Sequence, residues 1–222
     1  MDHFEVVMTK DGSKTLFLTK REVYYHSIHG AVSEAKHVYI EHGLRNINKS
    51  SLNILEMGFG TALNALVTFV ESSKANLKIN YLSVDNYPIN YEIVKQLDYP
   101  FFLSSQDYES LFKRMHCSDW NQETAISPNF NLFKFKSSIE TLSIDRKIDL
   151  VYYDAFAPKA NYNLWSVEIF KNLSRYLNDS AILVTYCANG QVKRNLKAAG
   201  FSLETLKGPP GKREMIRATW FQ

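Results

Sequence analysis

The stretch that most constrains the fold runs from Asn53 to Val67, where a short apolar segment is followed by glycines and then by a helical pattern. Residues 54–57 are apolar except for Glu56, which is typical of a buried strand. Gly58 and Gly60 allow a sharp turn and let a ligand approach the main chain, because glycine has no Cβ. The stretch therefore predicts a strand, a tight turn and a helix N-terminus, with room for a cofactor at the turn.

The spacing of the glycines distinguishes two kinds of cofactor. A dinucleotide fingerprint needs a third small residue where this chain has Leu63, which disfavours an NAD dehydrogenase. The pattern acid-x-G-x-G-x-G/A instead matches Glu56, Gly58, Gly60 and Ala62, and it is the pattern expected for S-adenosylmethionine. We therefore expect S-adenosylmethionine as the cofactor. The alternative is a glycine turn that joins a strand to a helix and binds nothing.

A second acid supports an adenosine ligand. Residues 77–84 read as the next strand, and Asp85 follows its last residue. In dinucleotide folds an acid at the tip of the second strand holds the ribose hydroxyls, and the same geometry serves any adenosine ligand. Asp85 is therefore a candidate ribose ligand.

The remaining pattern alternates strands with helices, which predicts an α/β fold preceded by an N-terminal hairpin. The hairpin is expected from strands at 4–8 and 16–18, and the further strands are expected at 131–136, 148–153, 181–186, 201–206 and 214–220, the last two antiparallel. Helices are expected at 33–42 with Ser33 as N-cap and Gly43 as stop, at 61–72, from Pro88 to just before Pro100, at 165–176 and at 191–199. Residues 101–127 show no clear pattern.

The length of 222 residues fits one domain, which we divide into an N-terminal extension at 1–45 and a Rossmann-like core at 46–222. The N-terminus lacks the features of a secretory signal, and no apolar run is long enough to cross a bilayer. Cys117 and Cys187 are far apart, which suits a reducing cytoplasm and predicts two small core residues rather than a disulfide or thiolate site.

The charge is unevenly distributed along the chain. After Gly190 the chain carries seven Lys and Arg against two acids, a charge of +5, whereas the first 190 residues sum to −2. A basic C-terminal quarter suggests an anionic partner, of which a phosphate backbone is the commonest, or else a solvated face.

A third acid marks a possible reaction centre. Residues 148–153 read as a strand buried on both faces, and Asp154 follows it, at the edge where ligands bind in open α/β sheets. Phe156 and Pro158 come next, and a loop rich in aromatic residues beside a carboxylate suits a flat ligand. The alternative is that Asp154 caps the next helix and Phe156 belongs to the core. A metal site is disfavoured because the histidines at 26, 29, 37 and 42 lack a paired carboxylate at ligand spacing.

With these motifs, the sequence resembles the tRNA (5-methylaminomethyl-2-thiouridylate) methyltransferase family typified by MnmC. The markers are GFGTALN at 58–64, D-x-F-A-P-x-x-N at 154–161 with Trp165 beyond, and K-G-x-x-x-KREM ending at Met215. The resemblance covers residues 24–217, about the whole chain. It implies the class I S-adenosylmethionine-dependent methyltransferase fold, in a stand-alone form without the flavin oxidase domain.

The resemblance also implies an activity and a set of site residues. The activity is transfer of a methyl group from S-adenosylmethionine to the aminomethyl group of a 2-thiouridine at the tRNA wobble position, with Asp154 holding the amine and accepting its proton. Cofactor contacts are expected from Glu56, Gly58, Phe59, Gly60, Thr61, Asn64, Asp85, Asn86 and Ser138. Substrate contacts are expected from Tyr25, Glu34, Phe156, Pro158, Trp165, Lys193, Arg194, Lys212 and Arg213, with the last four meeting phosphates of the anticodon region.

Two other classes of function stay open at this point. One is an aminopropyl or small-amine transferase on the same scaffold, although such enzymes usually carry paired acids where Asp154 stands alone. The other is a non-catalytic RNA-binding module with a decayed cofactor site, against which Glu56, Gly58, Gly60 and Asp85 speak.

Overall fold

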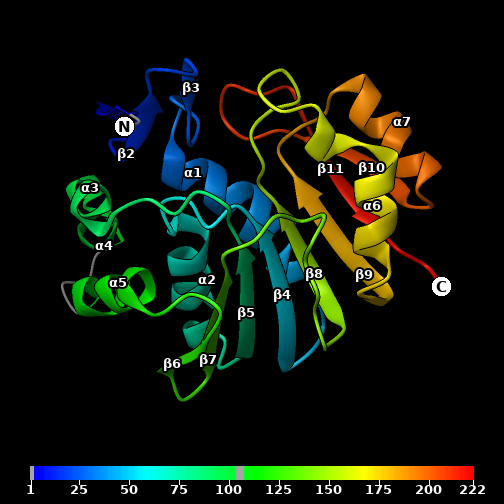
Figure 1. Cartoon of the computed structure of the whole chain (residues 1–222), viewed down its shortest axis with the longest axis horizontal. Helices are drawn as coiled ribbons and strands as arrows, with labels where there is room; N and C mark the ends of the chain where they lie inside the picture. Colours follow the sequence, from blue (N-terminus) through cyan, green and yellow to red (C-terminus); the bar gives the residue numbers. More distant parts are fainter. Residues whose placement is uncertain (1–2, 104–107) are drawn as a thin grey trace.

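The computed structural model describes residues 3–103 and 108–222, which form a small N-terminal sheet and a large sheet covered by helices on both faces (Figure 1). In the small sheet, β1 (Phe4–Met8) pairs antiparallel with β2 (Lys14–Leu18), so the predicted hairpin is confirmed. A short third strand, β3 (Val23–Tyr24), pairs antiparallel with β2.

The large sheet has the strand order β10-β11-β9-β8-β4-β5-β7-β6. Its strands are β4 (Ser51–Met57), β5 (Lys78–Val84), β6 (Glu123–Ser127), β7 (Phe130–Phe135), β8 (Ile148–Tyr153), β9 (Leu177–Thr185), β10 (Ser202–Lys207) and β11 (Glu214–Thr219). The central strands β7, β5, β4, β8 and β9 run parallel, while β6, β10 and β11 pair antiparallel at the edges. The predicted α/β fold and its closing antiparallel pair are therefore confirmed.

Helices cover the two faces of this sheet. They are α1 (Ala31–Ala35), which continues into a π-helix (Lys36–Glu41), α2 (Leu63–Lys74), α3 (Tyr91–Val94), α4 (Tyr99–Phe102), α5 (Tyr108–Cys117), α6 (Val167–Ser174) and α7 (Gly190–Ala198). Short 3-10 turns lie at Leu44–Asn46, Lys95–Leu97 and Asn163–Trp165. Figure 1 shows α6 and α7 at one side of the molecule and α3, α4 and α5 at the other.

The core divides into two clusters because side chains alternate between the faces of a strand. In β4, Ile54 packs with α1 and α2 on one face, whereas Leu55 packs with α6 and α7 on the other. In β8, Leu150 and Val151 divide in the same way. The first cluster also takes in Leu16 of the small sheet. Because this cluster contains residues from both sides of residue 45, the boundary between an extension and a core stays a prediction.

The predicted start of a helix at Pro88 was wrong. Pro88 does not begin a helix. Asn90 instead caps α3 by accepting a hydrogen bond from the backbone N–H of Glu92. Pro100 lies inside the first turn of α4, where its missing N–H costs nothing.

In the region without a clear pattern, α5 and β6 form. Cys187 is buried as expected, but Cys117 is exposed at the end of α5.

The N-cap of α1 was also misassigned. Gly30, with φ of 141°, is the N-cap residue, and Ser33 lies inside the helix. The hairpin turn supplies the cap instead, because Asp11 Oδ2 accepts a hydrogen bond of 2.9 Å from the backbone N–H of Ser33. Partial burial alone raises the pKa of Asp11, but hydrogen bonds from Ser13, Thr9 and Ser33 outweigh it and lower that pKa to about 2. The small sheet is thereby fastened to the first helix.

Asp11→Ala should lower the free energy of unfolding by about 1–2 kcal/mol, because it removes a helix cap that no residue of α1 replaces. Equilibrium denaturation by urea measures the loss. Glu5→Ala, an exposed change in the same hairpin, is the control and should stay within about 0.5 kcal/mol of the parent. Equal stabilities of the two variants would contradict the capping role.

Candidate functional site

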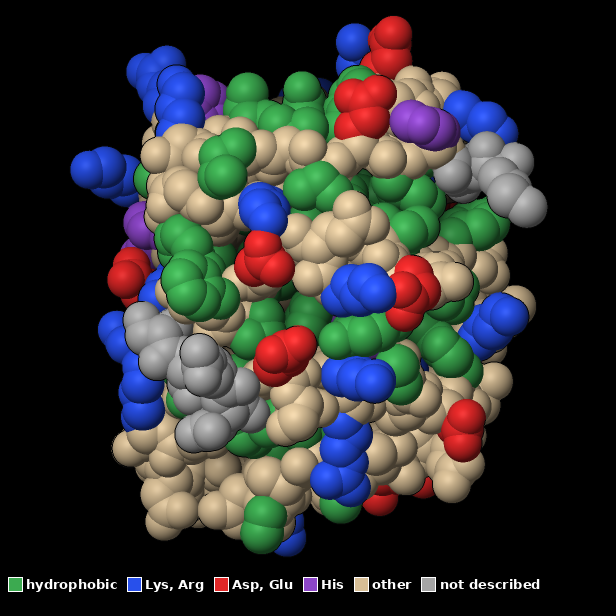
Figure 2. Space-filling view, turned by 90° about the vertical axis from the view of Figure 1, so that its left-hand side faces the viewer, with side chains coloured by type: hydrophobic (Ala, Val, Ile, Leu, Met, Phe, Trp, Pro, Cys, Tyr) green, Lys and Arg blue, Asp and Glu red, His purple; other side chains and the backbone are tan. Residues whose placement is uncertain are grey.

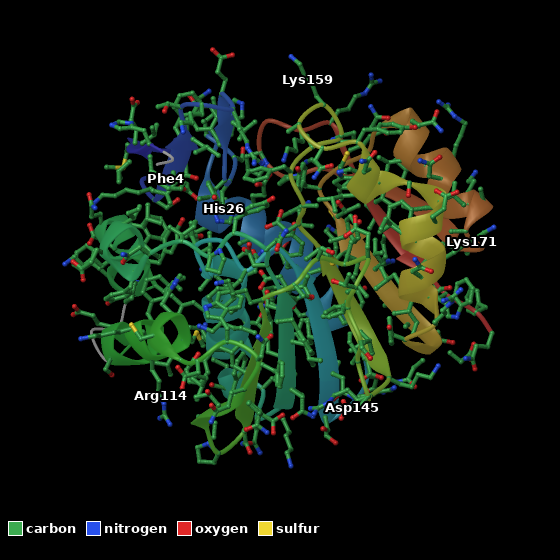
Figure 3. The ribbon with its side chains drawn as sticks, in the orientation of Figure 1. Phe4, His26, Arg114, Asp145, Lys159 and Lys171 are labelled. Atoms are coloured by element: carbon green, nitrogen blue, oxygen red, sulfur yellow. The ribbon has the colours of Figure 1, made fainter. Side chains whose placement is uncertain are left out.

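The parallel strands place three of the predicted residues at one edge of the sheet. Gly58 follows β4, Asp85 follows β5 and Asp154 follows β8, and these strands are neighbours in the sheet. Figure 3 shows this edge on the side of the labelled Lys159, with Asp145 at the opposite end. The loops after the strands therefore converge as expected for the ligand-binding crevice of an open α/β sheet.

The glycine turn adopts backbone conformations that favour glycine. Gly58 has φ of 91° and Gly60 φ of 48°, while Ala62, with φ of 59°, occupies the left-handed region without being a glycine. The backbone N–H of Gly58 donates to Val84 O at 2.9 Å, and that of Gly60 donates to Asp85 Oδ2 at 2.9 Å. The turn is thus tied directly to the end of β5.

Asp85 is held by the main chain and still has capacity for a ligand. Its Oδ1 accepts from the backbone N–H of Tyr87 at 2.8 Å, and burial raises its pKa although the backbone donors oppose that effect. A carboxylate has about four acceptor positions, so lone pairs remain after these two bonds. Vicinal hydroxyls such as those of ribose match that arrangement.

A first cavity of about 250 Å³, which we call the cofactor cavity, lies along the glycine turn. Its walls include the predicted Gly58, Phe59, Gly60, Thr61, Asn64, Asp85, Asn86 and Ser138. They also include Arg21, His26, Tyr87, Ile139 and Leu164, which sequence reasoning missed. Arg21 and Tyr87 form a cation–π contact, with 5.7 Å between the guanidinium carbon and the ring centroid. The hairpin therefore contributes to this cavity.

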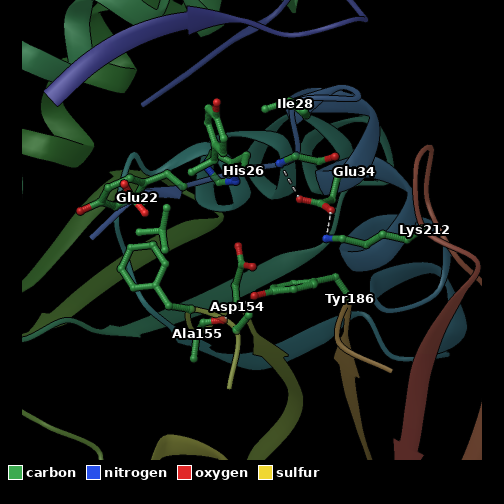
Figure 4. A pocket seen from close by; sticks show the side chains of 14 residues that line it. Glu22, His26, Ile28, Glu34, Asp154, Ala155, Tyr186 and Lys212 are labelled. Carbon is green, nitrogen blue, oxygen red and sulfur yellow. Dashed lines mark hydrogen bonds and ion pairs between the residues drawn. The ribbon is translucent and has the colours of Figure 1, made fainter. Parts of the chain in front are cut away.

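A second cavity of about 300 Å³ adjoins the first, and we call it the substrate cavity (Figure 4). It is lined by the predicted Tyr25, Glu34, Asp154, Phe156 and Lys212, together with His26 and Tyr186. Tyr25, His26, Asp154, Ala155 and Phe156 line both cavities. The two spaces therefore meet at Asp154. The rings of Tyr25 and Phe156 touch edge to face, with 5.2 Å between their centroids.

Asp154 is held by a hydrogen bond from α2 and faces polar groups of two other elements. Asn64 of α2 donates through Nδ2 to Asp154 Oδ2 at 2.7 Å. Burial raises the pKa of Asp154, and the Tyr39 hydroxyl, the Asn64 amide and the Lys212 ammonium oppose that rise. The next helix is capped by Ser166, not by Asp154. Asp154 is therefore a carboxylate that points into the cavity rather than a helix cap.

The far wall of the substrate cavity holds an ion pair. Glu34 of α1 pairs with Lys212 of the loop between β10 and β11, and Figure 4 shows the pair beside Asp154. Glu34 also accepts from the backbone N–H of Ser27 at 3.0 Å. The Lys212 ammonium lies 3.7 Å from the ring centroid of Tyr186, whose hydroxyl donates to Ala155 O at 2.8 Å. These contacts hold the wall together.

His26 lines both cavities, a position that sequence reasoning did not predict. Its Nε2 lies 2.7 Å from Thr61 Oγ1 in the glycine turn, and its ring also meets that of Tyr99 at 6.4 Å. Burial lowers the pKa of His26 to about 4, so the imidazole is neutral at physiological pH. No local sequence pattern predicts this contact of His26, because it joins residues 35 positions apart.

Three predicted contacts are placed elsewhere by the structure. Glu56 is 1% exposed and lies beneath the cofactor cavity without lining it. Trp165 is fully buried, and its Nε1 donates to Phe156 O at 2.8 Å, so it supports the loop from behind rather than contacting a substrate. Pro158 lies in the same loop but lines neither cavity. The structure thus does not bring Trp165, Pro158 or Glu56 to the walls of either cavity, and their contacts with ligands stay predictions.

The predicted phosphate contacts are only partly available. Lys193 Nζ forms an ion pair with Glu214 Oε2 at 2.6 Å, and Lys212 forms an ion pair with Glu34 inside the substrate cavity. Arg194 bonds the neutral side chain of Gln191, and Arg213 is exposed. Of the four predicted residues, Arg194 and Arg213 thus make no ion pair among the described residues. Figure 2 shows the face at the left of Figure 1, away from α7, where basic, acidic and hydrophobic side chains are interspersed.

Across residues 3–103 and 108–222 no helix has the length and apolarity needed to cross a membrane. The same residues contain no group of three or more His, Cys, Asp or Glu side chains arranged to hold a metal ion.

Comparison with known proteins identifies the family. Residues 110–220 match the model of a family described as S-adenosyl-L-methionine-dependent methyltransferase. The chain belongs to this methyltransferase family. Among curated proteins, it is 31% identical to the tRNA 5-methylaminomethyl-2-thiouridine biosynthesis bifunctional protein MnmC of Leptospira interrogans, over 86% of this chain and 32% of that protein. The corresponding protein of Burkholderia multivorans is 28% identical over 86% of this chain and 31% of its own length. The chain thus spans about a third of the length of these relatives.

Solved structures support the same fold for this methyltransferase. The chain superposes on MNMC2 of Aquifex aeolicus with a TM-score of 0.75 and 20% identity, over 100% of this chain and 72% of the other. Spermidine synthase of Thermotoga maritima matches with a TM-score of 0.58 and 9% identity, over 99% of this chain and 69% of the other. At such identities the likeness concerns the fold alone.

The residues of the cofactor cavity fit S-adenosylmethionine. The helix α2 begins at Leu63 without a side-chain cap, so its N-terminus can meet a carboxylate. Gly58 leaves the main chain open to a ligand, whereas a Cβ at Gly60 would meet the Tyr25 ring at 3.3 Å. Asp85 retains acceptors for ribose hydroxyls. No pyrophosphate is required, in agreement with Leu63 at the position where a dinucleotide fold needs a small residue.

Gly58→Ala should weaken S-adenosylmethionine binding about tenfold, because a side chain at φ of 91° is strained by about 1–2 kcal/mol and the turn must shift. Isothermal titration calorimetry measures the dissociation constant. Gly12→Ala is a matched control, since Gly12 has φ of 84° but lies in the distant hairpin turn. It should cost stability and leave the affinity unchanged. Equal affinity of Gly58→Ala and the parent would remove the turn from the cofactor site.

Proposed function

We propose that this methyltransferase transfers the methyl group of S-adenosylmethionine to the exocyclic amine of 5-aminomethyl-2-thiouridine at the wobble position of tRNA. The observation that carries the proposal is the meeting of the two cavities at Asp154, where a cofactor on one side faces a substrate on the other. The names of the MnmC relatives, which specify 5-methylaminomethyl-2-thiouridine biosynthesis in tRNA, support the choice of substrate. Such a substrate predicts action in the cytoplasm.

The substrate cavity suits a pyrimidine base that carries a cationic arm. Tyr25, Phe156 and Tyr186 supply aromatic surfaces, on which a base that has left the anticodon stack can pack at about 1–3 kcal/mol each. Asp154 and Glu34 place two carboxylates in the same space, and Lys212 balances one of them. The excess of negative charge favours an ammonium group such as a protonated aminomethyl arm.

The chemistry asked of the protein is mainly alignment. S-adenosylmethionine, when bound, supplies a methyl group that is already activated by its sulfonium. The amine reacts only as the neutral base, so Asp154 first holds the ammonium form and then takes its proton, directly or through a water molecule. Most of the acceleration comes from holding the amine about 3 Å from the methyl group that it attacks, while the aromatic walls exclude water. His26 stays neutral and keeps Thr61 in place.

Asp154→Asn should keep cofactor affinity but lower the single-turnover rate by about 100-fold or more, because the amine loses its proton acceptor. Mass spectrometry of nucleosides from methylated tRNA measures the rate. Asp145→Asn is the control, since Asp145 is exposed and lies before the opposite end of β8. It should react like the parent.

Other outcomes would favour the competing functions. A rate near that of the parent for Asp154→Asn would exclude Asp154 from the reaction. Transfer to putrescine in place of tRNA would favour a small-amine transferase, and failure to bind S-adenosylmethionine at millimolar concentration would favour a non-catalytic RNA-binding module.

The pH dependence of the reaction should respond to Lys212. The Lys212 ammonium lowers the pKa of Asp154, so Lys212→Met should raise that pKa. Because Asp154 acts as the ionised base, the acidic limb of the kcat/KM profile should move to higher pH. Lys212→Arg, which keeps the charge, should restore the profile. Lys193→Met, outside both cavities, should leave the limb in place, and an unmoved limb in Lys212→Met would contradict the electrostatic role.

A further inference from the structure

Glu56 is a buried acid that the proposed reaction does not use. It lies on β4 beneath the glycine turn, 1% exposed, and its Oε2 accepts a hydrogen bond of 2.8 Å from Ser83 Oγ. Within the part of the chain that the structure describes, Glu56 Oε1 makes no hydrogen bond of good geometry. An unpaired carboxylate oxygen in such a place is costly, so its protonation state needs an explanation.

Asn64 also has a buried oxygen without a hydrogen-bond donor. Its Nδ2 donates to Asp154 Oδ2 at 2.7 Å, whereas its Oδ1 is buried and likewise lacks a partner of good geometry among the described residues. The Glu56 and Asn64 side chains interact, so two acceptor oxygens without partners lie on neighbouring groups. Two acceptors can bond only if one of them carries a proton, and only the carboxyl group can gain one.

The hydrogen-bond donors around Glu56 and Asn64 leave one acceptor, Asn64 Oδ1, without a partner. Ser83 donates one hydroxyl to Glu56, and the Tyr81 hydroxyl also faces Glu56, although it makes no hydrogen bond of good geometry among the described residues. Both can serve the two carboxyl oxygens of Glu56, but neither is shown to reach Asn64 Oδ1. A proton on Glu56 supplies the missing donor. Burial also raises the pKa of Glu56 well above its usual value, and the charge of Asp154 adds to that rise, whereas the interactions of Glu56 with Ser83, Asn64 and Tyr81 oppose it without cancelling it.

We propose that Glu56 is a neutral carboxylic acid whose O–H donates to Asn64 Oδ1, so that Asn64 presents its N–H to Asp154. Glu56 is thereby a positioning residue for Asp154, a role that rests on the proposed function of Asp154 as the base. It acts on the reaction through Asn64 and not through contact with the cofactor, since it does not line the cofactor cavity.

The amide of Asn64 links the charges of the two acids. If Glu56 were ionised and Asp154 protonated, the Asn64 amide would be rotated by 180°. Its carbonyl oxygen would then accept a hydrogen bond from Asp154, and its N–H would donate to Glu56. The surroundings favour the first arrangement. Asp154 is partly exposed and has the Lys212 ammonium and the Tyr39 hydroxyl to stabilise its charge, whereas Glu56 is more deeply buried among an amide and hydroxyls. A neutral Glu56 therefore keeps Asp154 ionised and oriented.

Glutamine is the matched test of this proposal, because its amide N–H replaces the O–H of a neutral acid. Glu56→Gln should keep both the S-adenosylmethionine affinity and the single-turnover rate within about threefold of the parent. Glu56→Ala should lower the rate about tenfold or more and change the affinity much less, because Asn64 is no longer held against a charged partner. Glu71→Gln, an equivalent change on the outer face of α2, is the control.

Infrared difference spectroscopy gives a readout that does not depend on activity. The parent and Glu71→Gln should show the carbonyl band of a buried protonated carboxylic acid at neutral pH, shifted in heavy water, and Glu56→Gln should lack it. A parent without this band, or a rate in Glu56→Gln as low as in Glu56→Ala, would overturn the proposal. If the parent methylates no tRNA but shows the band, the proposed function fails while the protonation of Glu56 stands.

Discussion

The hydrogen bond from Asn64 to Asp154 joins the two halves of the proposed active site. Asn64 belongs to the helix that follows the glycine turn, and Asp154 follows the neighbouring strand β8, so this contact of 2.7 Å fixes the distance between the cofactor and substrate cavities. This bond also opposes the rise that burial causes in the pKa of Asp154, together with the Tyr39 hydroxyl and the Lys212 ammonium. The rest of the site can be understood as support for this pair: Glu56 beneath Asn64, and Tyr39 and Lys212 around Asp154.

The N-terminal segment has a larger part in this site than a hairpin appended to a core suggests. Its turn caps α1 through Asp11, and α1 carries Glu34 into the wall of the substrate cavity. The chain between the small sheet and α1 delivers Tyr25 and His26 to the boundary of both cavities. The π-helix that continues α1 brings the Tyr39 hydroxyl toward Asp154, in line with the frequent occurrence of such helices at functional sites.

The sequence predicted what depends on local pattern. The strand, glycine turn and helix around Gly58, and the acids after β5 and β8, follow from periodicity and spacing and were placed correctly. What it missed depends on tertiary contacts. The cap that Asp11 gives to α1 and the contact of His26 with Thr61 join distant segments. Trp165 looked like a ligand contact because aromatic residues serve both cores and binding sites, and only its complete burial decides between them.

The most direct test of this account is a crystal structure of the protein with S-adenosylhomocysteine and an anticodon stem-loop that carries 5-aminomethyl-2-thiouridine. The measurement is the distance from the aminomethyl nitrogen to the Asp154 carboxylate. The account predicts hydrogen-bond reach, about 3 Å directly or one water molecule apart, with the base between Tyr25, Phe156 and Tyr186 and the adenosyl group at the glycine turn. A base bound outside the substrate cavity, or an amine held by other groups with Asp154 turned away, would contradict it.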